Sequence, residues 1–225
     1  MVLEGYGPDR ILFDGDTIIT CVSNGKLARL NGLGQVEQVY DLGEYALHHD
    51  IGFGQDGEIL ALAELEGSEN VEDLLISIDM ESGEVTQLID FKEAMSGYYE
   101  MTRPISATDD FFWQAGEWDW IHLNSLQYME EDDSLIVSSR ETSTIIKLKN
   151  IHGDTELDWL AGDSRFWADT PYADYCLEQE GDFVPQYGQH CVEYLYDGDE
   201  EGVYYLAIYN NNCLLYTSPS PRDCS

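Results

Sequence analysis

The sequence predicts an all-β protein with the architecture of a partial β-propeller, an open arc of about three to four blades. Short runs of branched and aromatic residues recur along the chain between turns rich in glycine, asparagine and aspartate, which is the pattern of antiparallel strands. Three of the units that these runs form begin alike, with a histidine, an acidic or glycine-containing turn and an apolar second strand. These histidines are His49, His122 and His190. Repeated units of this kind indicate propeller blades.

Four successive units account for the predicted strands. The first has strands at 17–21, 26–30 and 36–40, and the second at 48–53, 58–64, 74–79 and 84–89. The third has strands at 121–128, 134–139, 144–148 and 156–160, and the fourth begins at His190 and continues at 203–209. Long connections at 91–118, opening with a short helix at 91–96, and at 161–187 separate the later units, and such connections commonly cover a functional site. Because the first strand of each blade lines the channel of a propeller, the opening histidines are expected to meet there.

Composition argues against several classes of partner and cofactor. The chain carries 45 acidic and 10 basic side chains, a net charge of −35, so nucleic acid and anionic membrane surfaces would repel it. No apolar run is long enough to span a membrane, and the start, MVLEGYGPDR, lacks the pattern of a secretion signal. The sequence has no glycine-rich phosphate loop and no metal-ligand spacing, so neither a cofactor nor a metal is expected. Nothing in the pattern indicates an oligomeric state.

One segment carries most of the functional information. Residues 119–140 read DWIHLNSLQYMEEDDSLIVSSR and place His122, Asn124 and Arg140 on two short strands joined by an acidic turn. A neutral imidazole can attack an electrophile or carry a proton, and a guanidinium can hold an oxyanion by two parallel hydrogen bonds. A lone strand histidine is more often structural, and a lone arginine more often forms a surface ion pair. The combination favours a catalytic site that handles an anion.

This segment resembles the Asp-Trp-x-His-x-Asn-Ser signature of the bacterial arylsulfate sulfotransferases, including the downstream Ser-Ser-Arg. Two further histidine motifs of that family occur as HHD at 48–50 and GQH at 188–190. The resemblance covers residues 40–212, which would be about half of the six-bladed ring of that family. The chain departs from the family at Glu141, where relatives often have histidine, and this leaves the substrate preference open.

The resemblance implies transfer of a sulfuryl group from an aryl sulfate donor to a phenolic acceptor through a histidine, without a nucleotide. His190 matches the nucleophile that becomes transiently sulfated, a task that suits imidazole because it attacks without prior deprotonation. His122 is expected to contact the sulfuryl group, and Arg140 to grip its oxygens and stabilise charge on them during transfer. Members of this family are often periplasmic or exported.

The remaining site residues are assigned from the same resemblance. His49 is expected to join the catalytic residues, and Asn124 and His48 are assigned to substrate binding. Because neighbours on a strand face opposite sides, only one of His48 and His49 is expected to reach the channel, and His49 is preferred from the alignment of the unit openings. His152 matches no motif and is expected to be exposed in a turn.

The end of the chain differs in character from the rest. Residues 213–223 read CLLYTSPSPRD and look like a translated sequencing adapter, the kind of segment that fold reasoning should exclude. The sequence therefore predicts a partial propeller domain at 1–212 and a non-native tail at 213–225. The chain would then be a fragment lacking blades, and the fragment itself is expected to be inactive.

The cysteines leave two alternatives open. Cys176 and Cys191 are suited to form a disulfide across a loop, as some relatives do near the active site, or to remain free thiols. Cys21 has no evident partner in the sequence.

A second class of function competes with catalysis. Propellers also serve as noncatalytic scaffolds that bind a ligand or a protein, and the acidic surface fits that use. Histidines at the openings of three units argue against it, because a scaffold has no reason to repeat an imidazole on successive channel strands.

Overall fold

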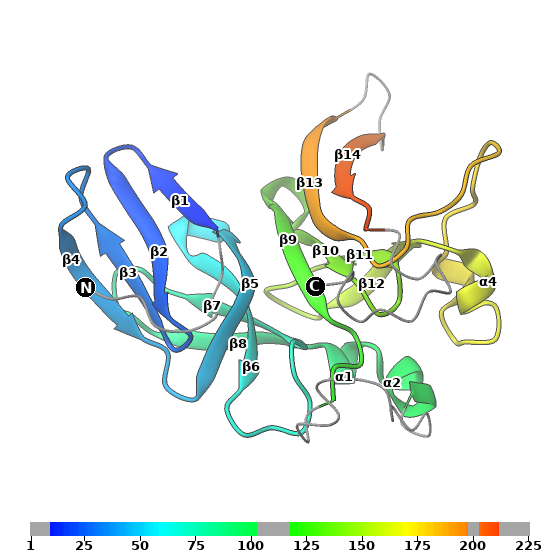
Figure 1. Cartoon of the computed structure of the whole chain (residues 1–225), viewed down its shortest axis with the longest axis horizontal. Helices are drawn as coiled ribbons and strands as arrows, with labels where there is room; N and C mark the ends of the chain where they lie inside the picture. Colours follow the sequence, from blue (N-terminus) through cyan, green and yellow to red (C-terminus); the bar gives the residue numbers. More distant parts are fainter. Residues whose placement is uncertain (1–9, 103–117, 198–202, 212–225) are drawn as a thin grey trace. The chain divides into compact units, whose positions relative to one another are not determined.

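The computed structural model describes residues 10–102, 118–197 and 203–211. The chain divides into two compact units, the first formed by residues 1–93 and 106–119 and the second by residues 94–105 and 120–225. In the described ranges the strands form four antiparallel sheets, three of four strands and one of two (Figure 1). The all-β prediction is confirmed. The predicted tail at 213–225 lies outside the described residues.

The first unit contains two four-stranded sheets in which the strands pair in chain order. One comprises β1 (Ile11–Asp14), β2 (Thr17–Ser23), β3 (Lys26–Leu30) and β4 (Val36–Asp41), and the other β5 (Tyr45–Phe53), β6 (Ile59–Leu65), β7 (Leu74–Ile78) and β8 (Val85–Asp90). All five residues of β7 are buried, as expected for a strand covered on both faces. A single apolar cluster joins the two sheets through residues such as Leu27, Leu47 and Ile76. Burial of these side chains is the main stabilising contribution to this unit.

The second unit contains a four-stranded sheet and a two-stranded one. The larger sheet has the order β12-β11-β10-β9 and comprises β9 (Leu123–Met129), β10 (Ser134–Ser139), β11 (Thr144–Lys149) and β12 (Glu156–Ala161). The smaller is the hairpin of β13 (His190–Asp197) and β14 (Tyr204–Tyr209). Val192 of the hairpin packs against Ile136 and Ile145 of the larger sheet. The start of β13 is thereby fixed beside β9 and β10.

The long connections contribute short helices and aromatic packing. The predicted helix at 91–96 is present as α1 (Phe91–Ala94), and α2 (Ser96–Thr102) follows it. The second connection contains α4 (Ser164–Trp167). Tyr98 of α2 lies with its ring centroid 5.2 Å from that of Trp167 and 6.0 Å from that of Trp120. Burial, with a smaller contribution from the Glu141 carboxylate, raises the pKa of Tyr98 well above its usual value.

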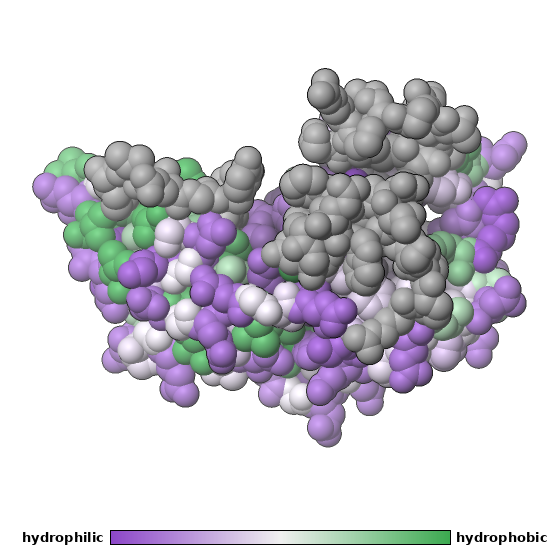
Figure 2. All heavy atoms as spheres, turned by 60° about the horizontal axis from the view of Figure 1, so that its bottom comes forward, coloured by the Kyte–Doolittle hydropathy of each residue, from purple (hydrophilic) through white to green (hydrophobic). Residues whose placement is uncertain are grey.

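Hydrophilic residues make up most of the coloured surface in the view of Figure 2, with hydrophobic residues between them. This distribution agrees with the net charge of −35. In the described part of the chain, none of the helices combines the length and the apolar composition needed to cross a bilayer.

Candidate functional site

The three predicted histidines share an unusual local backbone. His49 and His122 have positive φ angles of 51° and 49°, and Cys191, which follows His190, has φ 61°. The strand register also shifts between Leu47 and Ile51 in β5 and between His190 and Val192 in β13. A left-handed conformation costs a residue with a side chain on the order of 1 to 2 kcal/mol, and such strain persists where the surrounding structure enforces it, often at functional sites. A left-handed residue thus occurs within β5 at His49, directly before β9 at His122, and in β13 at Cys191, next to His190.

His122 and His190 lie together. Their ring centroids are 5.5 Å apart with the planes at 67°, an edge-on arrangement. His122 directly precedes β9 and His190 begins β13. The two strands are joined near this point because the main-chain N–H of Val192 donates to Oγ of Ser125 at 2.8 Å. The structure therefore brings together two histidines that are far apart in the sequence, as predicted.

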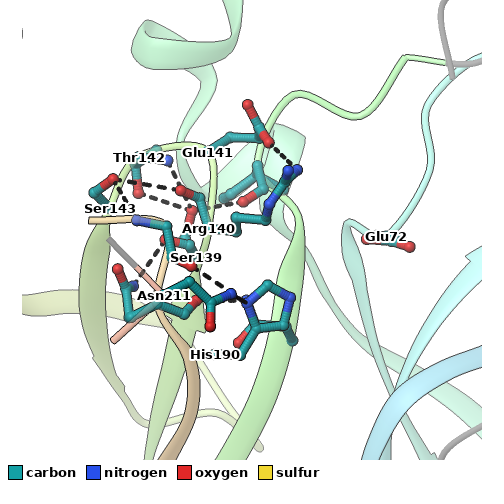
Figure 3. Close-up of polar contacts among 12 residues, drawn as sticks. Glu72, Ser139, Arg140, Glu141, Thr142, Ser143, His190 and Asn211 are labelled. Carbon is teal, nitrogen blue, oxygen red and sulfur yellow. Dashed lines mark hydrogen bonds and ion pairs between the residues drawn. The ribbon is translucent and has the colours of Figure 1, made fainter. Parts of the chain in front are cut away.

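Arg140 follows β10 and is linked to His122 through the main chain. Its backbone N–H donates to the carbonyl of His122 at 3.1 Å. The guanidinium turns toward Glu141, with Nη1 2.6 Å from Oε1 (Figure 3). The Arg140 side chain is 25% exposed and that of Glu141 34%, so water partly screens the pair. Glu141 therefore competes with an incoming anion for the guanidinium.

Lys147 provides a contrast to Arg140 in the same unit. Its side chain is only 2% exposed, and Nζ lies 2.8 Å from Asp132 and 3.3 Å from Asp158. Burial works to lower the pKa of Lys147, but the hydrogen bond with Asp132 and the attraction of its charge raise it overall. The ammonium is therefore compensated by two carboxylates, which makes Arg140 the better suited of the two cations to bind a substrate anion.

His190 contacts Asn211 and the main chain. Its Nδ1 is 2.9 Å from Nδ2 of Asn211 (Figure 3) and 3.4 Å from the carbonyl oxygen of Gly188. A nucleophilic Nε2 requires the proton on Nδ1, which would then be donated to an oxygen. The Gly188 carbonyl can accept it, and so can the Asn211 amide once it is turned so that Oδ1 faces the ring. The sequence did not predict a role for Asn211, because it lies 21 positions from His190 in the chain and belongs to no motif.

The first unit contains the second predicted histidine pair. The rings of His48 and His49 have centroids 5.3 Å apart and are nearly perpendicular. Nε2 of His49 lies 3.3 Å from Oε2 of Glu72, and ligand atoms of all three residues lie within 4.8 Å of one another. The prediction that His48 and His49 face opposite sides is therefore wrong. The register shift between Leu47 and Ile51 and the left-handed φ of His49 break the alternation on which it depended.

Glu72 is a candidate site residue that the sequence did not indicate. It is buried, 8% exposed, and has a φ of 59°. No motif surrounds it, and it reaches His49 because β5 pairs with β6, the strand that precedes Glu72 in the chain. Two imidazoles and a carboxylate at this spacing can pass a proton or hold a divalent cation such as zinc, an arrangement that the sequence spacing did not indicate. The meeting of His49 with His190 at one site stays a prediction.

Asn124 is buried and bridges two strands. Its Nδ2 donates to the carbonyl of Gln189 at 3.0 Å. Its Oδ1 has no hydrogen-bond partner among the described residues. The amide N–H₂ group of Asn124 thus makes a structural contact with the chain before His190. Only the amide oxygen remains available as an acceptor for the predicted role in substrate binding.

The cysteines and His152 complete the predicted residues. Cys21, Cys176 and Cys191 are free thiols in the structure, so of the two alternatives for Cys176 and Cys191 the free form is the one observed. Burial raises the pKa of the Cys176 thiol, which disfavours the reactive thiolate. His152 is exposed, as predicted, with Nδ1 2.6 Å from Oδ1 of Asp133.

Comparison with known proteins identifies a family and shows distant likeness to solved structures. No curated protein matches the sequence. A solved structure described as a putative 6-phosphogluconolactonase from Bacteroides uniformis ATCC 8492 is 12% identical, with a TM-score of 0.41 over 90% of this chain and 52% of that chain. The chain thus spans about half the length of that protein. The sequence model of the family described as Arylsulfotransferase (ASST) matches residues 3–219, and the chain belongs to this family.

Proposed function

We propose that the chain is part of an enzyme that moves a sulfuryl group from an aryl sulfate to a phenol through a sulfohistidine at His190. The observation that carries this proposal is the edge-on contact of His122 with His190, 5.5 Å between ring centroids, in a unit where Arg140 is bonded through its main chain to His122. Two imidazoles beside one guanidinium are the groups that nucleophilic transfer of an anionic group needs. Membership of the arylsulfotransferase family supports the same chemistry.

The first half-reaction uses His190 as the nucleophile. The lone pair of Nε2 attacks the sulfur of the aryl sulfate, an N–S bond forms, and the S–O bond to the aromatic ring breaks with its electron pair leaving on the phenolate. Arg140 exchanges Glu141 for the sulfate oxygens and stabilises their charge as the sulfuryl group moves. His122 lies beside the ring of His190 and stabilises the sulfuryl group during its transfer.

The second half-reaction returns the enzyme to its starting state. An acceptor phenol loses its proton to a base, its oxygen attacks sulfur, and the N–S bond breaks with its electron pair returning to His190. In this proposal His49, oriented by Glu72 at 3.3 Å, supplies the base and protonates the leaving phenolate in the first half-reaction. The Oδ1 of Asn124, which has no hydrogen-bond partner among the described residues, accepts a hydrogen bond from the phenolic hydroxyl as the acceptor binds, before the proton passes to His49.

The propeller architecture belongs to the same proposal. Three sheets of four antiparallel strands in chain order, followed by a hairpin, support their reading as successive blades. A distorted histidine segment in β5, directly before β9 and at the start of β13 supports their reading as equivalent first strands of successive blades. Further blades would be needed to close a ring, and the chain alone would then lack part of its site.

Activity with a chromogenic donor tests the proposal. The full-length protein is incubated with 4-nitrophenyl sulfate in the presence and absence of phenol, and nitrophenol release and phenyl sulfate formation are followed. The expected result is release that depends on the acceptor, with stoichiometric phenyl sulfate. A folded protein that releases no nitrophenol above the level without enzyme would favour the noncatalytic scaffold instead.

The ion pair at Arg140 leads to a prediction for Glu141. Glu141→Gln removes the carboxylate that pairs with the Arg140 guanidinium at 2.6 Å. An aryl sulfate then no longer competes with a carboxylate for the guanidinium. Since a partly exposed pair of this kind contributes up to about 1 kcal/mol, the KM for 4-nitrophenyl sulfate should fall roughly fivefold. Initial rates over a range of donor concentrations measure it, with Glu156→Gln, which breaks an exposed pair with Lys149, as the control. An unchanged or higher KM would contradict displacement of Glu141.

A further inference from the structure

Gln189 is buried between the strand ends that carry His190 and Arg140. Its side chain is fully shielded from solvent, 0% exposed. The amide Nε2 lies 3.0 Å from the carbonyl oxygen of Ser139, 3.2 Å from that of Thr144 and 3.2 Å from Oγ of Ser138. Because three oxygens surround a group with two hydrogens, the amide is held in one orientation. The side chain therefore joins the start of β13 to β10 and β11.

The contact with Ser139 engages the peptide group that links Ser139 to Arg140. The carbonyl of this group accepts from Gln189, and its N–H, that of Arg140, donates to the carbonyl of His122 at 3.1 Å. A peptide group is planar and rigid, so it cannot shift at one end alone. One peptide group thus couples the positions of His122, Arg140 and the residue before His190.

The main chain around His190 is fixed on both sides. The carbonyl of Gln189 accepts from Nδ2 of Asn124 at 3.0 Å, and the N–H of Val192 donates to Oγ of Ser125 at 2.8 Å. One residue further back, the N–H of Gly188 donates to Oγ of Ser143 at 3.1 Å, and the φ of Gly188 is 57°, a value that favours glycine. His190 therefore lies between two anchored segments of the main chain.

We infer that Gln189 is a positioning residue for sulfuryl transfer, which fixes the His190 imidazole relative to Arg140 and His122. This inference rests on the proposed function. The buried amide touches neither donor nor acceptor; it holds the strand starts so that the nucleophile meets the sulfur at the distance and angle that attack requires. A displacement of about 1 Å in such an arrangement can cost about a hundredfold in rate.

Gln189→Glu in the full-length protein tests the inference with almost no change in shape. The carboxylate cannot donate, and it would face the carbonyl oxygens of Ser139 and Thr144. We expect kcat for 4-nitrophenyl sulfate to fall about 10- to 100-fold while KM stays within about threefold, because substrate contacts are kept and geometry is lost. A buried carboxyl among acceptors has a raised pKa. Its protonated form offers one O–H donor, so kcat relative to the parent should recover as the pH falls.

Gln186→Glu is the matched control. Gln186 also donates from Nε2 to a main-chain carbonyl, that of Ala161 at 2.6 Å, but this carbonyl belongs to β12, which is separated from β10 by β11. Its kcat, KM and pH profile should equal those of the parent. The inference is overturned if Gln189→Glu keeps the parental kcat, if the control loses kcat equally, or if the loss merely follows the folded fraction measured by circular dichroism.

A second measurement separates this inference from the proposed function. If the parent has no transferase activity, the proposed function fails, and amide hydrogen exchange still decides the role of Gln189 in fixing the geometry. The Arg140 and Val192 amides should exchange faster in Gln189→Glu than in the parent, and at parental rates in Gln186→Glu. Unchanged protection of both amides would show that Gln189 does not fix the three residues.

Discussion

Replacing His190 by alanine in the full-length protein is expected to abolish sulfuryl transfer. A covalent intermediate on His190 has no route without its imidazole, although the imidazole of His122 lies only 5.5 Å away between centroids. The loss should reach the detection limit and should not be restored by higher donor concentration. Nitrophenol release from 4-nitrophenyl sulfate measures the effect.

Mass spectrometry decides whether His190 is the residue that becomes sulfated. The parent protein, quenched after exposure to donor alone, should carry one added SO₃ group on the peptide that contains His190, and His190→Ala should carry none. His152→Ala is the matched histidine control, because His152 is exposed and paired with Asp133, and it should retain full activity. A stable adduct on His122 or on a tyrosine, with none on His190, would show that His190 is not the nucleophile.

Arg140→Ala is expected to slow transfer about a hundred- to a thousandfold without abolishing the adduct. Removing one preorganised donor to charge that develops in a transition state typically costs this much. The variant also leaves Glu141, which pairs with the guanidinium at 2.6 Å, as an uncompensated negative charge that repels the anionic donor. KM should therefore rise together with the fall in kcat. His122→Ala should resemble Arg140→Ala more than His190→Ala.

Two further variants sharpen the Arg140 result. Arg165→Ala removes an arginine that is 82% exposed and pairs with Asp163, and it should leave the kinetics unchanged. The double variant Arg140→Ala with Glu141→Gln should recover part of the KM but not the kcat, because the repulsion is gone while the donor to the transition state is still missing. Equal kcat in the parent and in Arg140→Ala would remove Arg140 from the mechanism.

Local sequence patterns were sufficient for most strands. The runs at 26–30 and 134–139 became β3 and β10 without any shift of their ends, because turn residues bound each run on both sides. The strand β1 (Ile11–Asp14) was missed, since four residues are too few to display an alternation. The pairing of β1 with β2, a contact across a turn, supplies the stability that the pattern does not reveal.

The candidate site residues that belong to one sequence motif could be predicted. Those that meet only through strand pairing in the folded chain could not. His122 and Arg140 are found from their own segment, and the structure links them through a backbone hydrogen bond. The side to which His48 points depends on a bulge, which is set by the register of β5 against β6 rather than by local alternation. Glu72 and the amide of Gln189 become functional candidates only through contacts made in the folded chain.

The left-handed residues near the three histidines differ in whether the strained residue is the histidine itself. At His49 and His122 the strained residue carries the imidazole itself, so a glycine that relaxed the backbone would also delete the reactive group. At the third opening the strain falls on Cys191, next to His190. A glycine at position 191 can therefore relieve the strain and leave the imidazole of His190 in place, whereas a glycine at position 49 or 122 removes the imidazole together with the strain. If the three histidines act as proposed, thermal adaptation in this family should be freest at the position after His190.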